Sequence, residues 1–230
     1  MGMIRSIKSL VMGATLLLSA CTGGNETSTS TAGLFSLLVT SFQEKGSTTS
    51  KKKPLTREFI DKLPVSAMEI VLESRSITAL ISPYASRSDG SSGTIDTWRN
   101  AANSQIVLDN GVLIATRGAG NDLGSALVTS VVKSVKKRKA FSGPHVLYVS
   151  GFDNRSTQIK LECKMEVLGQ TRINIVGHSR NVVHLQEGCI SPIGSVTNDY
   201  WVDSVDSTVW QSRQWAGPSL GYLKLRVLKK

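Results

Sequence analysis

The sequence predicts a mainly β protein, with antiparallel, hairpin-rich sheets and a few short helices as a minor component. Runs rich in β-branched residues recur from residue 69 to the end, which is typical of strands. Asn110-Gly111 separates two such runs and readily supplies the two positive φ angles of a type I′ hairpin turn. Residues 222–228 alternate apolar with basic side chains, which indicates one buried and one solvated face.

Helices are expected before the first strands. Residues 33–44 place leucine, valine and phenylalanine at helical spacing. A short helix over 56–60 would begin after Thr56 as N-cap and end before Pro64. The strands expected in this half are 69–73, 76–81, 94–99, 105–108 and 112–117, with a turn or loop at 88–93.

The second half of the chain is expected to be richer still in strands. It opens with an ambiguous segment, residues 125–139, which permits an amphipathic helix whose late lysines would suit the helix dipole. Turns are expected at 169–170 and 177–181. The expected strands are 145–149, 157–168, 171–176, 182–185, 198–202, 207–211 and 222–228.

The N-terminus predicts export. Residues 1–20 combine a basic start with an apolar run that is roughly half the ~20 residues of a membrane span, so they indicate a signal peptide. The residues Leu17-Leu18-Ser19-Ala20-Cys21 match the lipobox of bacterial lipoproteins, in which the cysteine thiol takes a diacylglyceryl group. We therefore expect lipidation at Cys21; the alternative is an ordinary signal peptide cut near a cysteine.

The lipid anchor also predicts a location and a domain organisation. Two or more acyl chains hold a protein stably at a membrane. Thr22 follows the cysteine in place of an inner-membrane retention Asp, so we expect the outer membrane and its periplasmic face. Residues 21–32, mostly Thr, Ser, Gly and Asn, predict a flexible tether, and 33–230 a single β-rich domain.

The chain is basic. Its formal charge of +10 falls to +8 when Arg5 and Lys8 leave with the signal. The excess is concentrated at 51–53 and 133–139, which could bind acidic lipid or acidic polysaccharide, or form a merely solvated surface. Export excludes the usual nucleic-acid partners.

The two remaining cysteines predict a disulfide. Cys163 and Cys189 form an even pair outside the cytoplasm, and a bond between them would close a loop of about 25 residues, which stabilises by roughly 3 kcal/mol. The alternatives are two free thiols, or a metal pair with His178 or His184. No short metal-ligand spacing supports the second alternative.

The sequence predicts no enzyme, no metal and no cofactor. It has no Gly-x-Ser-x-Gly elbow. Asp199, Asp203 and Asp206 lie near two tryptophans and superficially suggest a glycoside-cleaving pair. Asp203 and Asp206 fit a hairpin turn better, because aspartate bonds its own backbone there.

Aromatic residues are the candidates for contact with a glycan or a partner. Aromatic faces stack on sugar rings, although tryptophans on strands more often belong to the core. Trp215, beside Gly217-Pro218, is the best candidate for exposure. The candidates are Trp98, Tyr200, Trp201, Trp210 and Trp215.

Two stretches resemble one family of bacterial lipoproteins. The first runs from Trp98 to Gly118 and continues through Asn121-Asp122-Leu123, where the family shows a tryptophan, two strands around an Asn/His-Gly turn and a Thr-x-Gly ending. The second, residues 198–203 with 209–214, follows the family pattern Asn-x-Tyr-Trp-Val-Asp … Val-Trp-x-Ser-x-Gln. With the lipobox, these segments resemble the YjbF-type outer-membrane lipoproteins of the group 4 capsule and exopolysaccharide operons.

The resemblance implies an outer-membrane lipoprotein that acts as an accessory factor in capsule or exopolysaccharide assembly or secretion. As partners it implies the membrane, through the lipid anchor, an outer-membrane β-barrel, and other periplasmic polysaccharide-secretion proteins. It supplies no catalytic residues. The alternative function is a periplasmic glycan-binding module that uses exposed aromatic and basic residues on the polysaccharide.

Overall fold

The computed structural model describes residues 55–88, 93–151 and 155–230. The predictions for the signal peptide, Cys21, the tether, the helix over 33–44 and the lysines at 51–53 lie outside the described residues. Within them the predicted fold class is confirmed, because antiparallel strands form most of the structure and only short helices accompany them.

The elements follow one another as a long meander of hairpins. Thr56 caps the first helix as expected, and its hydroxyl accepts a hydrogen bond from Phe59 N at 3.3 Å. The elements are α2 (Arg57–Asp61), β1 (Ala67–Leu72), the 3-10 helix η1 (Glu73–Arg75), β2 (Ile77–Ser88), β3 (Thr94–Arg99), β4 (Gln105–Asp109), β5 (Val112–Arg117), β6 (Leu123–Leu127), α3 (Thr129–Lys137), β7 (Phe141–Ser150), β8 (Ser156–Ile175), β9 (His178–Ser191), β10 (Gly194–Asp203), β11 (Val209–Trp215) and β12 (Tyr222–Lys229).

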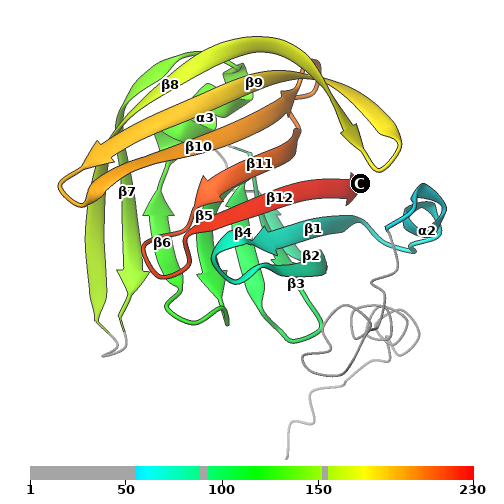
Figure 1. The fold of residues 1–230 in the computed structure, drawn as a ribbon, viewed down its shortest axis with the longest axis horizontal. Coiled ribbons are helices and arrows are strands. Elements are labelled where there is room, and N and C mark those ends of the chain that lie inside the picture. Colours follow the sequence, from blue (N-terminus) through cyan, green and yellow to red (C-terminus); the bar gives the residue numbers. More distant parts are fainter. Residues whose placement is uncertain (1–54, 89–92, 152–154) are drawn as a thin grey trace, which may run out of the picture.

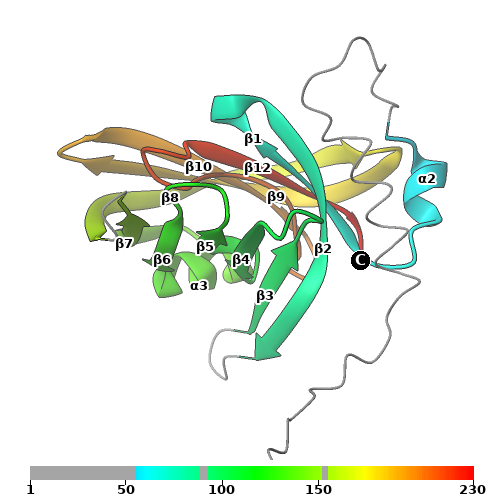
Figure 2. The same ribbon diagram turned by 90° about the horizontal axis from the view of Figure 1, so that it is seen from below.

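The strands form one curled sheet. Its order is β5-β4-β3-β2-β1-β12-β11-β10-β9-β8-β7-β6, and each neighbouring pair is antiparallel. Strands β8 to β12 with β1 lie in front of β4 to β6 (Figure 1), and the two layers appear edge-on in Figure 2. The curl makes the two edge strands, β5 and β6, neighbours.

Strand β2 carries the sheet around one bend. Its residues 77–81 pair with β1, and residues 82–88 pair with β3. The register shifts between Pro83 and Ala85, at the change of partner. Proline has no N–H for a ladder and is tolerated at such irregular positions, so Pro83 fits the bend.

Side chains close the seam between β5 and β6. The Thr116 hydroxyl accepts a hydrogen bond from Leu123 N at 3.0 Å and donates one to Asp122 at 2.7 Å. The Arg117 guanidinium donates to the carbonyls of Leu123 and Gly124 at 3.3 and 3.2 Å. These bonds give the backbone at the edges of the sheet the partners that a strand ladder would otherwise supply.

Helix α3 fills part of the space that the sheet encloses. It packs against β7 and β10. Its valines Val131, Val132 and Val135 are buried in one cluster with Tyr200 of β10 and Leu185 of β9. The ambiguous segment 125–139 therefore contains both the end of β6 and a helix with a buried valine face. Neither of the α-helices that the described residues form has the length and apolar composition to cross a membrane.

Strand β8 runs without a break, so the turn predicted at 169–170 is wrong. The register with β9 shifts between Val167 and Gly169, and Gly169 has a φ of +117°. This is a β-bulge, in which an extra residue bends one strand while pairing continues. A glycine within a strand pattern can mark a bulge or a turn, and here it marks the bulge.

The turn between β8 and β9 lies at Val176-Gly177, and the prediction of 177–181 is wrong. Both residues have positive φ, 46° and 86°, and Ile175 pairs with His178 on either side of them. Valine rarely adopts this conformation because its branched Cβ is crowded there. Val176 packs against the main core cluster, and that burial offsets the local cost. The strand predicted over 207–211 is also shifted along the chain: as β11 it begins at Val209 and ends at Trp215.

A disulfide joins the middle of β8 to the last residues of β9. Cys163 and Cys189 are direct partners in the antiparallel ladder, and their sulfurs are bonded at 2.04 Å. Both residues belong to the buried core. The bond therefore links two long neighbouring strands inside the sheet.

Replacement of both cysteines by serine is expected to lower the free energy of unfolding by about 3 kcal/mol, because the bond restrains an unfolded loop. The two cysteines are 26 positions apart. Urea unfolding of the wild type and of the Cys163→Ser/Cys189→Ser variant measures the difference. Wild-type protein with its disulfide reduced serves as the control and should show a similar loss. An unchanged unfolding midpoint in both would contradict the expectation.

Candidate functional site

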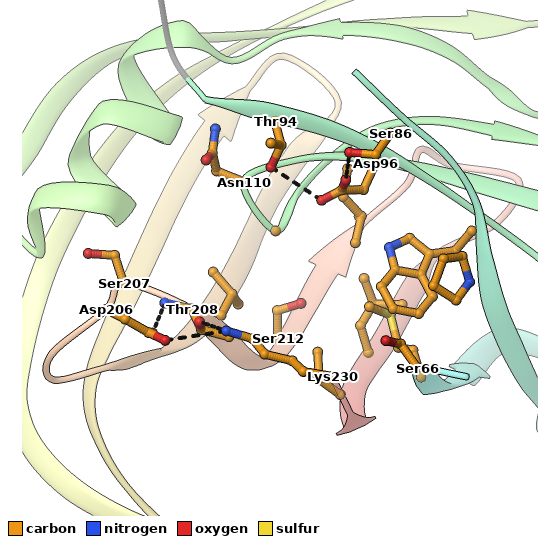
Figure 3. Close-up of a pocket in the computed structure, with 18 of the residues that line it drawn as sticks. Ser66, Ser86, Thr94, Asp96, Asn110, Asp206, Ser207, Thr208, Ser212 and Lys230 are labelled. Carbon is orange, nitrogen blue, oxygen red and sulfur yellow. Dashed lines mark hydrogen bonds and ion pairs between the residues drawn. The ribbon is translucent and has the colours of Figure 1, made fainter. Parts of the chain in front are cut away.

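A cavity of about 380 Å³ lies inside the curled sheet, between strands β1 to β4 on one side and β11 and β12 on the other (Figure 3). Its volume is within the range of roughly 300–1,000 Å³ that is usual for small-molecule sites. The last turn of α3 and the turn between β10 and β11 also line it. We refer to this cavity as the sheet pocket; it has an apolar part and two polar walls.

The apolar part comes from inward-facing strand residues. Trp98 of β3 adds an indole that is only partly buried and that packs against the main core. The pocket is thus a section of the sheet interior that the core side chains do not fill. The other apolar lining residues are Met68, Pro83, Ala85, Leu108, Val209, Leu225 and Val227.

The first polar wall comes from β2 and β3. Ser86 and Asp96 are partners in the ladder, and the serine hydroxyl donates to Asp96 Oδ1 at 2.6 Å. The Thr94 hydroxyl donates to Asp96 Oδ2 at 3.4 Å. Asn110, from the β4–β5 turn, lies beside Thr94 in Figure 3. Two hydroxyls therefore orient one carboxylate toward the pocket.

The second polar wall faces the first across the pocket (Figure 3). Asp206 accepts a hydrogen bond from Thr208 N at 2.9 Å and pairs with Lys230 Nζ at 3.4 Å. The Lys230 ammonium also bonds the Thr208 hydroxyl. The Thr208 hydroxyl, with help from Lys230, holds the pKa of the Asp206 carboxyl below its usual range. The Asp206 and Lys230 side chains are 57% and 51% exposed, so a ligand could reach both.

Gln214 of β11 holds the β4–β5 turn, which lines the pocket beside the first wall, against β11. Its Oε1 accepts a hydrogen bond from Leu113 N at 2.8 Å, and its Nε2 donates to Gly111 O at 2.9 Å. Gln214 is only 2% exposed. Gly111 has a φ of +85°, and a Cβ there would lie 2.6 Å from Val209. The β4–β5 turn is therefore held directly against β11, and only glycine fits at its closest approach.

The predicted aspartates build the turn beside the second wall. Asp203 accepts hydrogen bonds from Val205 N at 2.8 Å, from Asp206 N at 3.3 Å and from the Trp210 indole N–H at 2.8 Å. Burial opposes ionisation of Asp203, but these hydrogen bonds outweigh it and lower the pKa of its carboxyl. The interpretation of Asp203 and Asp206 as turn residues agrees with these contacts.

The predicted aromatic candidates do not form one site. Trp98 lines the sheet pocket. Tyr200 is 0% exposed inside the core, and Trp210 is 6% exposed with the Arg180 guanidinium 4.0 Å above its ring. Trp201 is partly buried and stacks on His184 at 4.5 Å, while His184 contacts Asp199 at 2.9 Å.

Trp215 is partly buried rather than fully exposed, and its backbone N–H bonds Asn198 Oδ1 at 2.8 Å. It packs against the main core cluster, as Trp201 does. Neither side chain reaches the sheet pocket lining. Contact of a glycan or a partner with Trp201 and Trp215 stays a prediction.

One group in the described residues is close enough to hold a metal ion. His145, Cys163, Glu187 and Cys189 place one ligand atom each within 4.8 Å of one another. The disulfide engages both sulfurs, and a metal needs thiolates, so only His145 and Glu187 keep their donor atoms. The histidine beside the disulfide is His145, whereas the sequence suggested His178 or His184.

The carboxylate of Glu187 is the centre of a buried hydrogen-bond network. Glu187 is 0% exposed and accepts from Asn198 Nδ2 at 2.8 Å and from the Tyr200 hydroxyl at 3.3 Å, with His145 Nδ1 at 3.1 Å. Burial and the neighbouring Glu187 carboxylate raise the pKa of Tyr200 well above its usual value, so its hydroxyl remains a donor. These contacts give the buried Glu187 carboxylate structural partners in the core, whereas the Nε2 atom of His145 is buried without a hydrogen-bond partner among the described residues.

Most pocket residues were missed from the sequence. Asp96, Thr208 and Lys230 carry no motif, and they lie far apart in the chain. Three sequence signals did point to residues of this pocket: Trp98, Asp206 and the lysine cluster, since Lys136 of α3 lines the pocket.

Comparisons with known proteins give one family match. A family model described as "Group 4 capsule polysaccharide lipoprotein gfcB, YjbF" matches residues 31–228. Among solved structures, the chain is similar to the hypothetical lipoprotein YmcC from Escherichia coli K12, with 22% identity and a TM-score of 0.66, over 80% of this chain and 98% of that chain. At this identity the likeness supports the fold alone. A search of curated proteins found no match.

Gln214→Ala is expected to lower the free energy of unfolding by about 1–3 kcal/mol, because it leaves the buried Leu113 N–H without an acceptor. Urea unfolding measures the loss. Gln211→Ala is the matched control, since Gln211 lies on the same strand and is more exposed. Equal effects of the two substitutions would contradict the role of Gln214.

Trp210→Phe is expected to raise the pKa of Asp203, because it removes the indole donor and keeps an aromatic ring. A lowered carboxyl pKa stabilises the fold above the unfolded-state value near 3.9, and this contribution is lost as pH falls through the folded-state pKa. The stability deficit of the variant, about 1 kcal/mol at pH 7, should therefore shrink on acidification below about pH 4. Unfolding free energies at several pH values test this, and a deficit independent of pH would contradict it.

Proposed function

This chain belongs to the group 4 capsule polysaccharide lipoprotein family, and from that premise we propose that it is an accessory factor in capsule or exopolysaccharide assembly or secretion. The family match carries the proposal, because it spans residues 31–228 and so includes nearly everything after the predicted tether. The lipid would be held by Cys21, the cysteine of the lipobox.

In this proposal the protein acts as an adaptor at the periplasmic face of the outer membrane. Acylation at Cys21 would restrict the folded sheet to a layer near the membrane, where two or more acyl chains anchor stably. Its partners would be an outer-membrane β-barrel and other periplasmic proteins of polysaccharide secretion. The proposal assigns no catalytic step to the protein.

Glycan binding is a second candidate function, and the sheet pocket is the observation that favours it. The pocket combines an indole with carboxylate, hydroxyl and ammonium groups in a concave site. Sugars have apolar ring faces, which stack on an indole, and hydroxyl groups, which hydrogen-bond to carboxylate, hydroxyl and ammonium groups. An adaptor that also contacts the polymer would have both properties.

Deletion of the gene in its own host is expected to reduce surface polysaccharide or trap polymer in the periplasm. Complementation with the wild type should restore the surface polymer, whereas Cys21→Ser should not, because it lacks the lipid. Surface and periplasmic polymer are quantified separately, and immunoblots establish equal amounts of the two proteins. Unchanged polymer in the deletion strain would contradict the proposed function, and rescue by Cys21→Ser would contradict the need for the anchor.

A further inference from the structure

We propose that the sheet pocket and the exposed face of α3 form one binding site for an anionic glycan. A sugar ring would occupy the pocket beside Trp98, and carboxylates of the polymer would lie on the lysines of α3. The inference rests on the proposed function, because it names the chemistry of the polymer that the same protein would handle.

The pocket itself is suited to one sugar residue of the polymer, while the adjacent sugars of the chain remain outside it. Trp98 and the apolar lining offer a surface for a ring face, and Asp96 and Asp206 offer acceptors from opposite walls. The hydroxyls of Ser86 and Thr94 hold the Asp96 carboxylate in place before any ligand arrives. Preorganised acceptors of this kind reduce the entropy cost of binding.

The outer face of α3 is cationic. Lys133, Lys136 and Lys137 lie at i, i+3 and i+4, all exposed, while the valines of the same helix are buried. Like charges at this spacing repel and destabilise a helix slightly. The helix dipole favours the two lysines of the last turn but not Lys133. Within residues 55–88, 93–151 and 155–230, neither Lys133 nor Lys137 forms an ion pair.

The cationic face and the pocket are joined by specific contacts. Lys136 is on that face and also lines the pocket. Ser207, beside Asp206 in the second wall, donates to the Lys136 carbonyl at 2.8 Å and accepts from Arg138 at 2.6 Å. The end of α3 is thus fixed to the pocket wall, and one ligand could reach both.

The shape of the site favours a polysaccharide over a lipid surface. The pocket is a hollow inside the curled sheet (Figure 3), which a single residue of a chain polymer can enter. A bilayer is flat on this scale and would contact the lysines without filling the hollow. A polymer of carboxylated sugars supplies both the ring for the pocket and the negative charge for α3.

Isothermal titration of the purified folded protein with a mannuronate hexamer tests the inference, with neutral mannohexaose as the comparison ligand. We expect saturable binding of the uronate, weaker binding of the neutral hexamer, and loss of the difference at high salt, which screens exposed charges. Lys133→Gln/Lys137→Gln should weaken uronate binding about five- to tenfold, as expected for two exposed ion pairs, and should leave the neutral hexamer unaffected.

Matched variants distinguish loss of the proposed site from a change in overall charge and from misfolding. Lys160→Gln/Lys164→Gln removes the same charge from exposed positions on β8 and should bind as the wild type does. Trp98→Ala should weaken both hexamers roughly tenfold. Trp98→Phe keeps an aromatic ring and should retain part of the affinity, which guards against misfolding of the alanine variant.

Three results would overturn the inference: no saturable uronate binding, equal losses in the two lysine pairs, or binding of phosphatidylglycerol vesicles that depends on Lys133 and Lys137 without any binding of the hexamer. A deletion phenotype without uronate binding would overturn this inference and leave the proposed function standing. Uronate binding that needs Lys133, Lys137 and Trp98, with no deletion phenotype, would support the site and contradict the proposed role in secretion.

Discussion

The hydrogen bonds of edge strand β5 hold the curled sheet together. An edge strand exposes backbone donors and acceptors that need partners, and an unsatisfied group in the interior is costly. Gln214 satisfies the start of β5 from across the interior, and Thr116 and Arg117 join its end to β6. Side chains thereby join β5 to β6, between which the described residues form no regular strand ladder. The curl, and with it the enclosed space, depends on these contacts.

The enclosed space explains why a pocket exists. An interior is normally close-packed, and α3 with the inward side chains of β8 to β10 achieves this on one side. Toward β2 and β3 the described residues insert no helix, and the hydrogen bond from Gln214 to the Gly111 carbonyl holds the β4–β5 turn against β11 at the edge of the pocket. The same side chain that satisfies the edge strand also positions the β4–β5 turn that lines the pocket. Fold stability and the candidate site are therefore coupled at Gln214.

Local sequence signals predicted the strands, whereas the bulge at Gly169, the turn at Val176 and the pocket depend on contacts between residues that are distant in the chain. The Asn110-Gly111 turn was predictable because both residues tolerate positive φ, and the structure gives them 47° and 85°. Gly169 was misread because a bulge and a turn share the same local signal, and only pairing with β9 distinguishes them. Val176 offered no turn signal, since its conformation depends on burial against distant residues. The pocket could not be predicted from local signals either, because Asp96 and Lys230 come to line the same cavity only once the sheet has curled.

Helix α3 contributes apolar side chains to the core and charged side chains to the surface from opposite faces. Its valines fill the interior beside Tyr200, and its lysines are exposed, with Lys136 lining the pocket. The two sets of side chains occupy opposite faces, so a lysine can be changed without creating a cavity, and a valine without changing the charge. A change that alters the charge of α3 should therefore act on ligand affinity and leave the unfolding free energy nearly constant. Gln214 differs from these lysines: its substitution should affect the fold and the pocket together, because its side chain bonds both the start of β5 and the β4–β5 turn that lines the pocket.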